Sequence, residues 1–123
     1  MAVRMNTTTA TRIAALTGFL AVALGALGAH ALECRLEHNG LMATWRTGAL
    51  YHAVHAVVLL VLAQRATVSR LPFILFCIGI LLFSGSLYAL AFFNVRNLGY
   101  ITPFGGLSLL AGWLVLAIRP SQS

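Results

Sequence analysis

Four long apolar runs, none of which contains Asp, Glu, Lys or Arg, constrain the fold of this chain more than any other feature. Each run has about 20 residues, the length that an α-helix needs to cross a hydrocarbon core of about 30 Å. A transmembrane barrel would need strands of alternating polarity, and the runs do not alternate. Because a helix satisfies its own backbone hydrogen bonds, the sequence predicts an all-α integral membrane protein. We expect one membrane domain over residues 1–123, a four-helix bundle with spans at about 13–32, 47–63, 71–93 and 101–118.

The composition agrees with a membrane location. Hydrophobic residues make up 60% of the chain and charged residues only 8%, whereas about a quarter of the residues in a soluble domain are charged. The net charge of +6 comes from arginines that fall singly at the ends of the apolar runs, not from the basic patch of a nucleic-acid-binding protein. The two cysteines, Cys34 and Cys77, form neither a disulfide framework nor a CxxC metal pair. These features exclude a soluble enzyme and a nucleic-acid partner, and leave the lipid bilayer as the expected surroundings.

Short connections at residues 65–70 and 94–100 predict that neighbouring spans are antiparallel. An even number of spans places both termini on the same side of the membrane. The positive-inside rule assigns the arginine-rich side to the cytoplasm, so we expect both termini there. The arginines on the side of the termini are Arg4, Arg12, Arg65, Arg70 and Arg119, and those on the other side are Arg35, Arg46 and Arg96.

The connection between the first two runs is longer and amphipathic. Its apolar residues alternate with Glu33, Arg35 and Glu37. This pattern predicts a short interfacial helix that breaks at Asn39-Gly40, with Trp45 at headgroup depth.

The first run raises the question of a cleaved signal peptide, because Ala29-His30-Ala31 has the small-x-small pattern of a signal-peptidase site. The run is longer than a usual signal core, and small residues recur along it four positions apart. That spacing lets helix backbones approach closely, so we expect a retained span. Close helix packing is expected at Gly25, Gly28, Gly85, Gly105, Gly106 and Gly112.

Polar side chains within the spans fall toward one leaflet when neighbouring spans are antiparallel. Such groups usually face the interior of a bundle and find partners there. The simplest interpretation is that they bond to one another across helices and fix the packing. The candidate polar cluster consists of His30, Tyr51, His52, His55, Ser84, Ser86, Tyr88, Thr102 and Ser108.

Three other interpretations stay open. The cluster forms a polar pocket for a ligand or a transported species, with His55 as a proton carrier because imidazole titrates near neutral pH. Alternatively, His52 and His55 share a helix face and join His30 in holding a metal, or two histidines on facing helices hold a haem. Catalysis by Ser84 or Ser86 with His55 lacks a carboxylate in the spans to orient the imidazole. We therefore expect no enzymatic activity, no metal and no cofactor.

Several sequence blocks are distinctive in combination. They are GALGAH at 25–30, Thr47-Gly48 followed by Tyr51 and His55, FSGSLY at 83–88, TPFGG at 102–106 and AGW at 111–113. With these blocks the chain resembles the YgdD-like family of small integral membrane proteins of unknown function. It departs from the family pattern at His52, where relatives usually have Gln, and this departure argues against a family-wide histidine pair.

The resemblance implies a four-span bacterial inner-membrane protein and supplies no established activity, cofactor or partner. We expect a non-enzymatic structural or interaction component that packs with itself, as a homo-oligomer, or with a larger membrane complex. The alternatives are a small transporter or ligand-binding protein with a polar pocket under one leaflet, and a His-based metal or haem protein.

Overall fold

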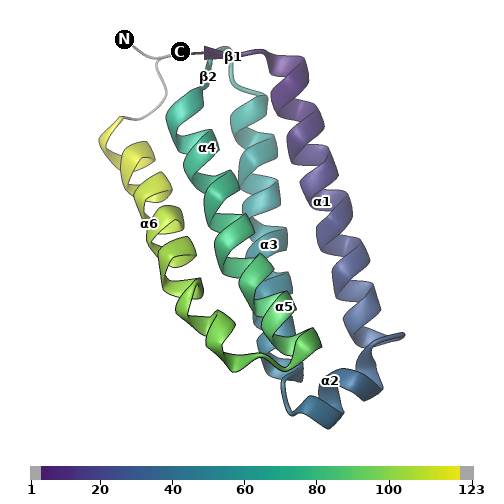
Figure 1. Ribbon diagram of the computed structural model, residues 1–123. Coiled ribbons are helices and arrows are strands. Elements are labelled where there is room, and N and C mark those ends of the chain that lie inside the picture. Colours follow the sequence, from purple (N-terminus) through teal and green to yellow (C-terminus); the bar gives the residue numbers. More distant parts are fainter. Residues whose placement is uncertain (1–3, 120–123) are drawn as a thin grey trace.

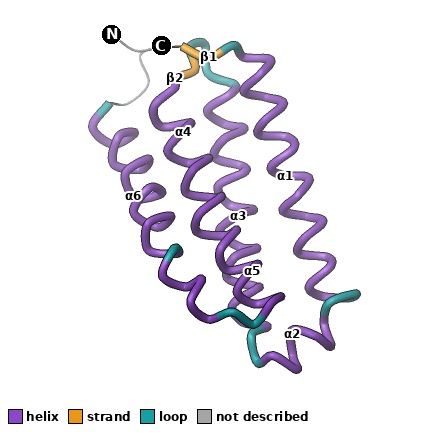
Figure 2. The backbone as a smooth tube through the Cα atoms, viewed as in Figure 1, coloured by secondary structure: helices purple, strands orange, loops and turns teal. Residues whose placement is uncertain are grey.

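The computed structural model describes residues 4–119, and its backbone is almost entirely helical (Figure 2). In chain order the elements are β1 (Arg4–Met5), α1 (Thr7–Ala29), α2 (Glu33–Asn39), α3 (Met42–Ala63), β2 (Val68–Ser69), α4 (Arg70–Gly79), the π-helical turn η1 (Ile80–Ser84), α5 (Gly85–Phe93), the 3-10 helix η2 (Arg96–Tyr100) and α6 (Thr102–Ile118).

Four stretches of helix are long and apolar enough to cross a membrane, which confirms the all-α four-span fold. α1 extends beyond its apolar run because a polar residue caps its start. α1 begins directly after Asn6, whose side-chain oxygen accepts hydrogen bonds from the amides of Thr8 and Thr9 at 2.8 and 3.3 Å. The four stretches are α1, α3, the continuous segment Arg70–Phe93 made of α4, η1 and α5, which we call the third span, and the segment Arg96–Ile118 made of η2 and α6.

The bundle is open, because the spans lie in a row and not at the corners of a square (Figure 1). α1 packs mainly on α3, α3 packs on the third span, and α6 packs on the other side of the third span. β1, β2 and the C-terminal end of α6 lie at one end of the helix bundle, and α2 and η2 lie at the opposite end. β1 pairs antiparallel with β2, with Arg4 opposite Ser69 and Met5 opposite Val68, and so ties the start of the described chain to the α3–α4 connection.

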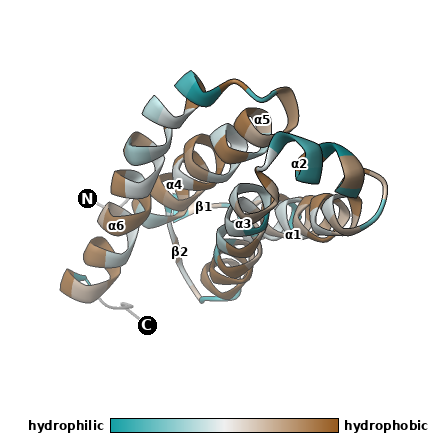
Figure 3. Cartoon of the chain, turned by 90° about the horizontal axis from the view of Figure 1, so that it is seen from below, coloured by the Kyte–Doolittle hydropathy of each residue, from teal (hydrophilic) through white to brown (hydrophobic). Residues whose placement is uncertain are grey.

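Two clusters of buried apolar side chains hold the row together. The outward faces of the helices carry exposed Leu, Val and Phe side chains, while hydrophilic residues concentrate in α2 and near η2 (Figure 3). This distribution suits helices that are surrounded by lipid. The first cluster contains Ala10, Ala14, Leu59, Leu62, Ala63, Val68, Phe73, Phe76, Ile80 and Leu109, and the second contains Leu36, Leu41, Trp45, Leu90 and Ala91.

The predicted short helix between the first two spans is present as α2. It ends at Gly40, whose φ of 70° lies in the left-handed region that favours glycine. Trp45 lies in the first turn of α3, near the end of the span, and its side chain is only 4% exposed. Its indole N–H donates to the carbonyl of Leu24 at 3.0 Å, in the space that Gly28 leaves open on α1.

Three of the expected packing glycines lie where two helices touch. A Cβ atom on Gly28 would collide with the indole of Trp45, and one on Gly105 would collide with the backbone of Leu82 and Phe83. At Gly112 the added atom would lie 2.8 Å from the ring of Phe76.

The other expected packing glycines have more room. A Cβ on Gly106 would meet the Phe83 ring at an ordinary 3.7 Å. Nothing lies within 4 Å of the corresponding atom on Gly25, and Gly85 would meet only Leu81 Cδ1 at 4.0 Å. The packing role expected for Gly25 and Gly85 is therefore corrected, since small-residue spacing alone does not say which face of a helix meets a neighbour.

Candidate functional site

Most of the candidate polar residues form separate hydrogen bonds that link neighbouring spans. The exceptions are His30 and Tyr51, whose side chains are exposed. His55 joins α3 to α6: its Nδ1 lies 2.7 Å from the carbonyl oxygen of Tyr51, and its Nε2 accepts a hydrogen bond from the indole N–H of Trp113 at 3.1 Å. A carbonyl can only accept and an indole N–H can only donate. The imidazole is therefore the neutral tautomer with its hydrogen on Nδ1.

His52 makes different contacts, although it lies only three residues from His55. Its Nδ1 lies 2.9 Å from the hydroxyl oxygen of Tyr88 on the third span. Close by, the hydroxyl of Ser84 donates to the carbonyl of Gly48 at 2.7 Å. Both bonds join α3 to the third span.

Two further bonds join the third span to α6. The Ser86 hydroxyl donates to the carbonyl of Phe83 at 3.0 Å, so the Thr102 hydroxyl donates to Ser86 across a distance of 2.6 Å. The Ser108 hydroxyl donates to the carbonyl of Leu75 at 2.7 Å. Within residues 4–119, every fully buried side-chain nitrogen or oxygen has a hydrogen-bond partner. The polar groups thus act as bonds between helices.

The histidines do not converge on a common centre. His30 caps the end of α1 and is exposed, whereas His52 and His55 are buried and bond to different spans. In the part of the chain that the structure describes, no group of three or more His, Cys, Asp or Glu side chains is placed to hold a metal. The hydroxyls of Ser84 and Ser86 are bonded to backbone carbonyls, so neither forms the nucleophile–base pair with His55 that catalysis would require.

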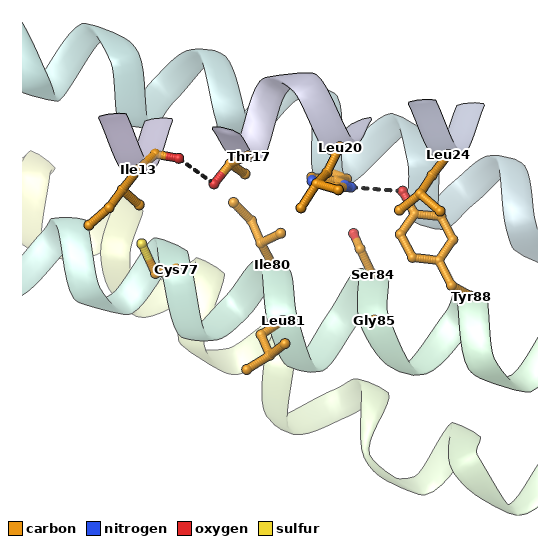
Figure 4. Close-up of a pocket in the computed structure, with 11 residues that line it drawn as sticks. Ile13, Thr17, Leu20, Leu24, Cys77, Ile80, Leu81, Ser84, Gly85 and Tyr88 are labelled. Atoms are coloured by element: carbon orange, nitrogen blue, oxygen red, sulfur yellow. Dashed lines mark hydrogen bonds between the residues drawn. The ribbon is translucent and has the colours of Figure 1, made fainter. Parts of the chain in front are cut away.

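A groove lies between α1 and the third span, near the polar residues (Figure 4). It arises because both elements pack on α3 from adjacent sides, which leaves α3 as the floor. Its volume is about 330 Å³ and its lining is almost entirely apolar, with His52 and Tyr88 among the few polar side chains. The full lining consists of Ile13, Thr17, Leu20, Leu24, His52, Cys77, Ile80, Leu81, Ser84, Gly85 and Tyr88.

The third span is irregular where it lines the groove. In η1 the helix widens to a π-helical turn, and the Gly85 amide donates to the carbonyl of Ile80, five residues earlier. Single π-helical turns within α-helices are frequent at functional sites. Gly85, just after this turn, contributes no side chain and so leaves the groove open at that point (Figure 4).

Three residues of these contacts were not among the predicted polar cluster. Trp113 and Trp45 are the donors to His55 and to the Leu24 carbonyl, and Gly48 supplies the acceptor for Ser84. A buried tryptophan usually needs an acceptor for its N–H, so the two tryptophans carried a usable signal. The backbone acceptor of Gly48 carried none, because it depends on which helices are neighbours.

Four apolar spans, joined by buried hydrogen bonds and bearing a lateral groove, define a small integral membrane protein. Comparison with known families agrees: residues 24–106 match the family described as Protein of unknown function (DUF423). The chain belongs to this family.

Named relatives cover most of the chain. A UPF0382 membrane protein of Haemophilus influenzae is 46% identical over 116 residues, which are 90% of this chain and 92% of the relative. The UPF0382 membrane protein YwdK of Bacillus subtilis is 39% identical over 86% of this chain and 90% of its own. The UPF0382 inner membrane protein YgdD of Escherichia coli is 39% identical over 85% of this chain and 83% of its own. These matches confirm the family resemblance expected from the sequence blocks. No solved structure matches the chain.

Proposed function

We propose that this protein is a non-enzymatic, ligand-binding component of the membrane that holds an apolar molecule in the groove between α1 and the third span. The observation that carries the proposal is the groove itself, with its apolar lining and its volume of about 330 Å³, which is in the range of small-molecule sites. Because three neighbouring spans line it, molecules dissolved in the bilayer reach it directly.

The non-enzymatic part of the proposal rests on how the reactive side chains are used. The imidazole of His55 is bonded on both ring nitrogens, and the hydroxyl of Ser84 is committed to a backbone carbonyl. Nucleophilic catalysis needs a free nucleophile beside an oriented base.

The experiment is photo-crosslinking in lipid nanodiscs with an alkyl probe that carries a diazirine. We expect the crosslinks of the wild type to concentrate on groove residues and to fall sharply in Gly85→Leu, whose side chain fills the opening. Gly25→Leu is the matched control, because Gly25 also has free space around it but lies outside the groove lining. Crosslinks spread evenly over all lipid-facing residues, and equal in both variants, would contradict ligand binding in the groove.

A second candidate is association with another copy or with a larger membrane complex. The observation that favours it is that the outermost helices use one face each for packing: on α1, for example, Leu16, Phe19 and Val22 are 64%, 62% and 74% exposed. The mass of the protein purified in mild detergent, with mass spectrometry of co-purifying proteins, tests this role. A bare monomer without partners would argue against it.

We further propose that the protein lies in the bacterial inner membrane with both termini in the cytoplasm. The E. coli relative is named an inner membrane protein. The end of the molecule that holds β1, β2 and the end of α6 carries the larger share of the arginines, and the opposite end carries Glu33 and Glu37 as well. The positive-inside rule favours this orientation.

A further inference from the structure

We propose that the occupant of the groove is one acyl chain of an anionic phospholipid, whose phosphate lies at the arginines beside β1 and β2. This inference rests on the proposed function of the groove and adds the chemical class of its ligand. Three observations support it: the polar side chains of the groove already have partners, the groove is as long as one leaflet is thick, and one of its ends is positively charged.

The polar side chains that line the groove are hydrogen-bonded within the protein. The Thr17 hydroxyl donates to a backbone carbonyl of α1 at 2.7 Å, and the Ser84 hydroxyl donates to a backbone carbonyl of α3 at 2.7 Å. His52 and Tyr88 share a hydrogen bond of 2.9 Å, and the backbone carbonyl of Thr17 lies beside the same imidazole. The groove therefore suits a saturated hydrocarbon chain, which needs no hydrogen bond.

The length of the groove matches one leaflet of a bilayer. The groove extends along α1 from Ile13 to Leu24, which is about 16 Å at 1.5 Å per residue. One leaflet supplies half of a hydrocarbon core of about 30 Å, so its acyl chains extend over about 15 Å. Arg12, which is exposed, directly precedes Ile13, and arginines that flank a span lie at the membrane surface. A chain that enters the groove at Ile13 thus reaches Leu24 while its headgroup stays at the surface.

The end of the bundle where the groove begins is positively charged. β1 leads into α1 and β2 leads into α4, and these helices belong to the two walls of the groove. The pairing of the strands places Arg4 opposite Ser69, the residue before Arg70. Arg70 lies seven residues, about two turns, before Cys77 of the groove lining, and so on the same side of α4.

No carboxylate side chain opposes an anionic headgroup at this end. Arg4, Arg12 and Arg70 are exposed, and both acidic residues of the chain lie in α2, at the opposite end of the bundle (Figure 1). The planar guanidinium group binds phosphate through two parallel hydrogen bonds. The arginines therefore favour an anionic phospholipid, and the apolar groove takes one of its chains.

The test uses two phospholipid probes with the same diazirine-labelled acyl chain, one with a phosphoglycerol and one with a phosphocholine headgroup. Each probe is added in trace amounts to the protein in phosphatidylcholine nanodiscs. We expect the phosphoglycerol probe to label groove residues about fivefold more than the phosphocholine probe, the factor that one arginine contributes near anionic lipid.

Arginine variants show whether the charge at this end causes the preference. The double variant Arg12→Gln/Arg70→Gln should bring the labelling by the two probes close to equal. Arg96→Gln, at the opposite end of the bundle, is the matched control and should keep the preference. Salt of about 1 M, which shortens the Debye length to about 3 Å, should also weaken the preference in the wild type.

The outcomes separate this inference from the proposed function. Equal labelling of the groove by both probes in the wild type, lost in Gly85→Leu, would overturn the anionic phospholipid and still support an apolar ligand. An unchanged preference in Arg12→Gln/Arg70→Gln would overturn the assigned headgroup site. If that variant does not fold, a preference that is insensitive to salt overturns it instead. Labelling spread evenly over all lipid-facing residues by both probes would contradict binding in the groove itself.

Discussion

At the scale of single residues, His55 shows how a buried polar side chain fixes helix packing. Both of its ring nitrogens are bonded, one within α3 and one to Trp113 on α6, and the rings of Phe76 and Trp113 lie 5.7 and 6.0 Å from it. The imidazole therefore acts as a hydrogen-bond acceptor that holds α6 against α3.

Replacing His55 tests this role. His55→Ala leaves the Trp113 N–H without its acceptor, and we expect a loss of about 0.6–2 kcal/mol for that interhelical bond. His55→Gln supplies a carbonyl acceptor and should recover most of the stability. Melting temperature in detergent and metal analysis of both variants and the wild type provide the readout. A stoichiometric metal in the wild type that is lost from His55→Gln would contradict the packing role.

Adjacent glycines on α6 offer a second prediction at this scale. Gly105→Ala places a methyl group into the backbone of Leu82 and Phe83 in η1, so we expect destabilisation of about 1–3 kcal/mol, as for overpacked cores. Gly106→Ala is the matched control, because its Cβ meets the Phe83 ring at 3.7 Å. Its free energy of unfolding should stay within about 1 kcal/mol of the wild-type value. Equal melting temperatures of the two variants would show that α6 does not pack against η1 through its backbone.

At the scale of elements, α2 caps the end of the third span. The Nε of Arg35 donates to the carbonyl of Phe92 at 2.8 Å, and the guanidinium lies 4.1 Å from the centre of the Phe92 ring. The Asn39 amide donates to the carbonyl of Ala91 at 2.9 Å. The last carbonyls of a helix lack partners within it and attract positive charge. α2, which is far from α5 in sequence, thus supplies hydrogen-bond donors to the last carbonyls of the third span.

Variants of this cap should loosen the end of α5. We expect Arg35→Ala and Asn39→Ala each to cost about 1 kcal/mol and to speed hydrogen exchange of the amides near Phe93. Arg46→Ala, which removes an exposed arginine at the same end of the molecule, is the control. Unchanged hydrogen exchange in the double variant Arg35→Ala/Asn39→Ala would mean that α2 contacts α5 without stabilising it.

At the scale of the whole molecule, the two ends of the helix bundle can be told apart, so the orientation of the protein in the membrane can be measured. α2 lies at the end opposite the described chain ends, so Cys34, which is exposed in α2, reports which side that end faces. Cys77 lies within the third span and lines the groove. The two thiols therefore distinguish the aqueous surface from the bilayer.

The orientation is tested with a membrane-impermeant maleimide added to spheroplasts. With both termini in the cytoplasm, Cys34 should be labelled and Cys77 should not. The Cys34→Ser variant should lose all labelling, which controls for reaction elsewhere. Labelling of Cys34 only after the membranes are opened would reverse the proposed orientation.

The amino-acid sequence alone predicts the number of spans, their antiparallel order and the break after α2. These features follow from the length of uninterrupted apolar runs, the shortness of the connections and a glycine at a left-handed position, all of which are local. It also gave the right general expectation that intramembrane polar groups bond across helices, because an unpaired polar group in hydrocarbon is costly.

Which polar residues pair, and which glycines touch a neighbour, follows from the packing of the helices in three dimensions. His52 and His55 share a helix and differ by three positions, yet one bonds to Tyr88 and the other to Trp113. Gly25 and Gly28 also differ by three positions, yet only Gly28 lies against another side chain. The physical reason is that each choice depends on how a helix is rotated about its axis against its neighbours. In a chain that is apolar on every side, no polar face marks that rotation, so only packing between helices fixes it.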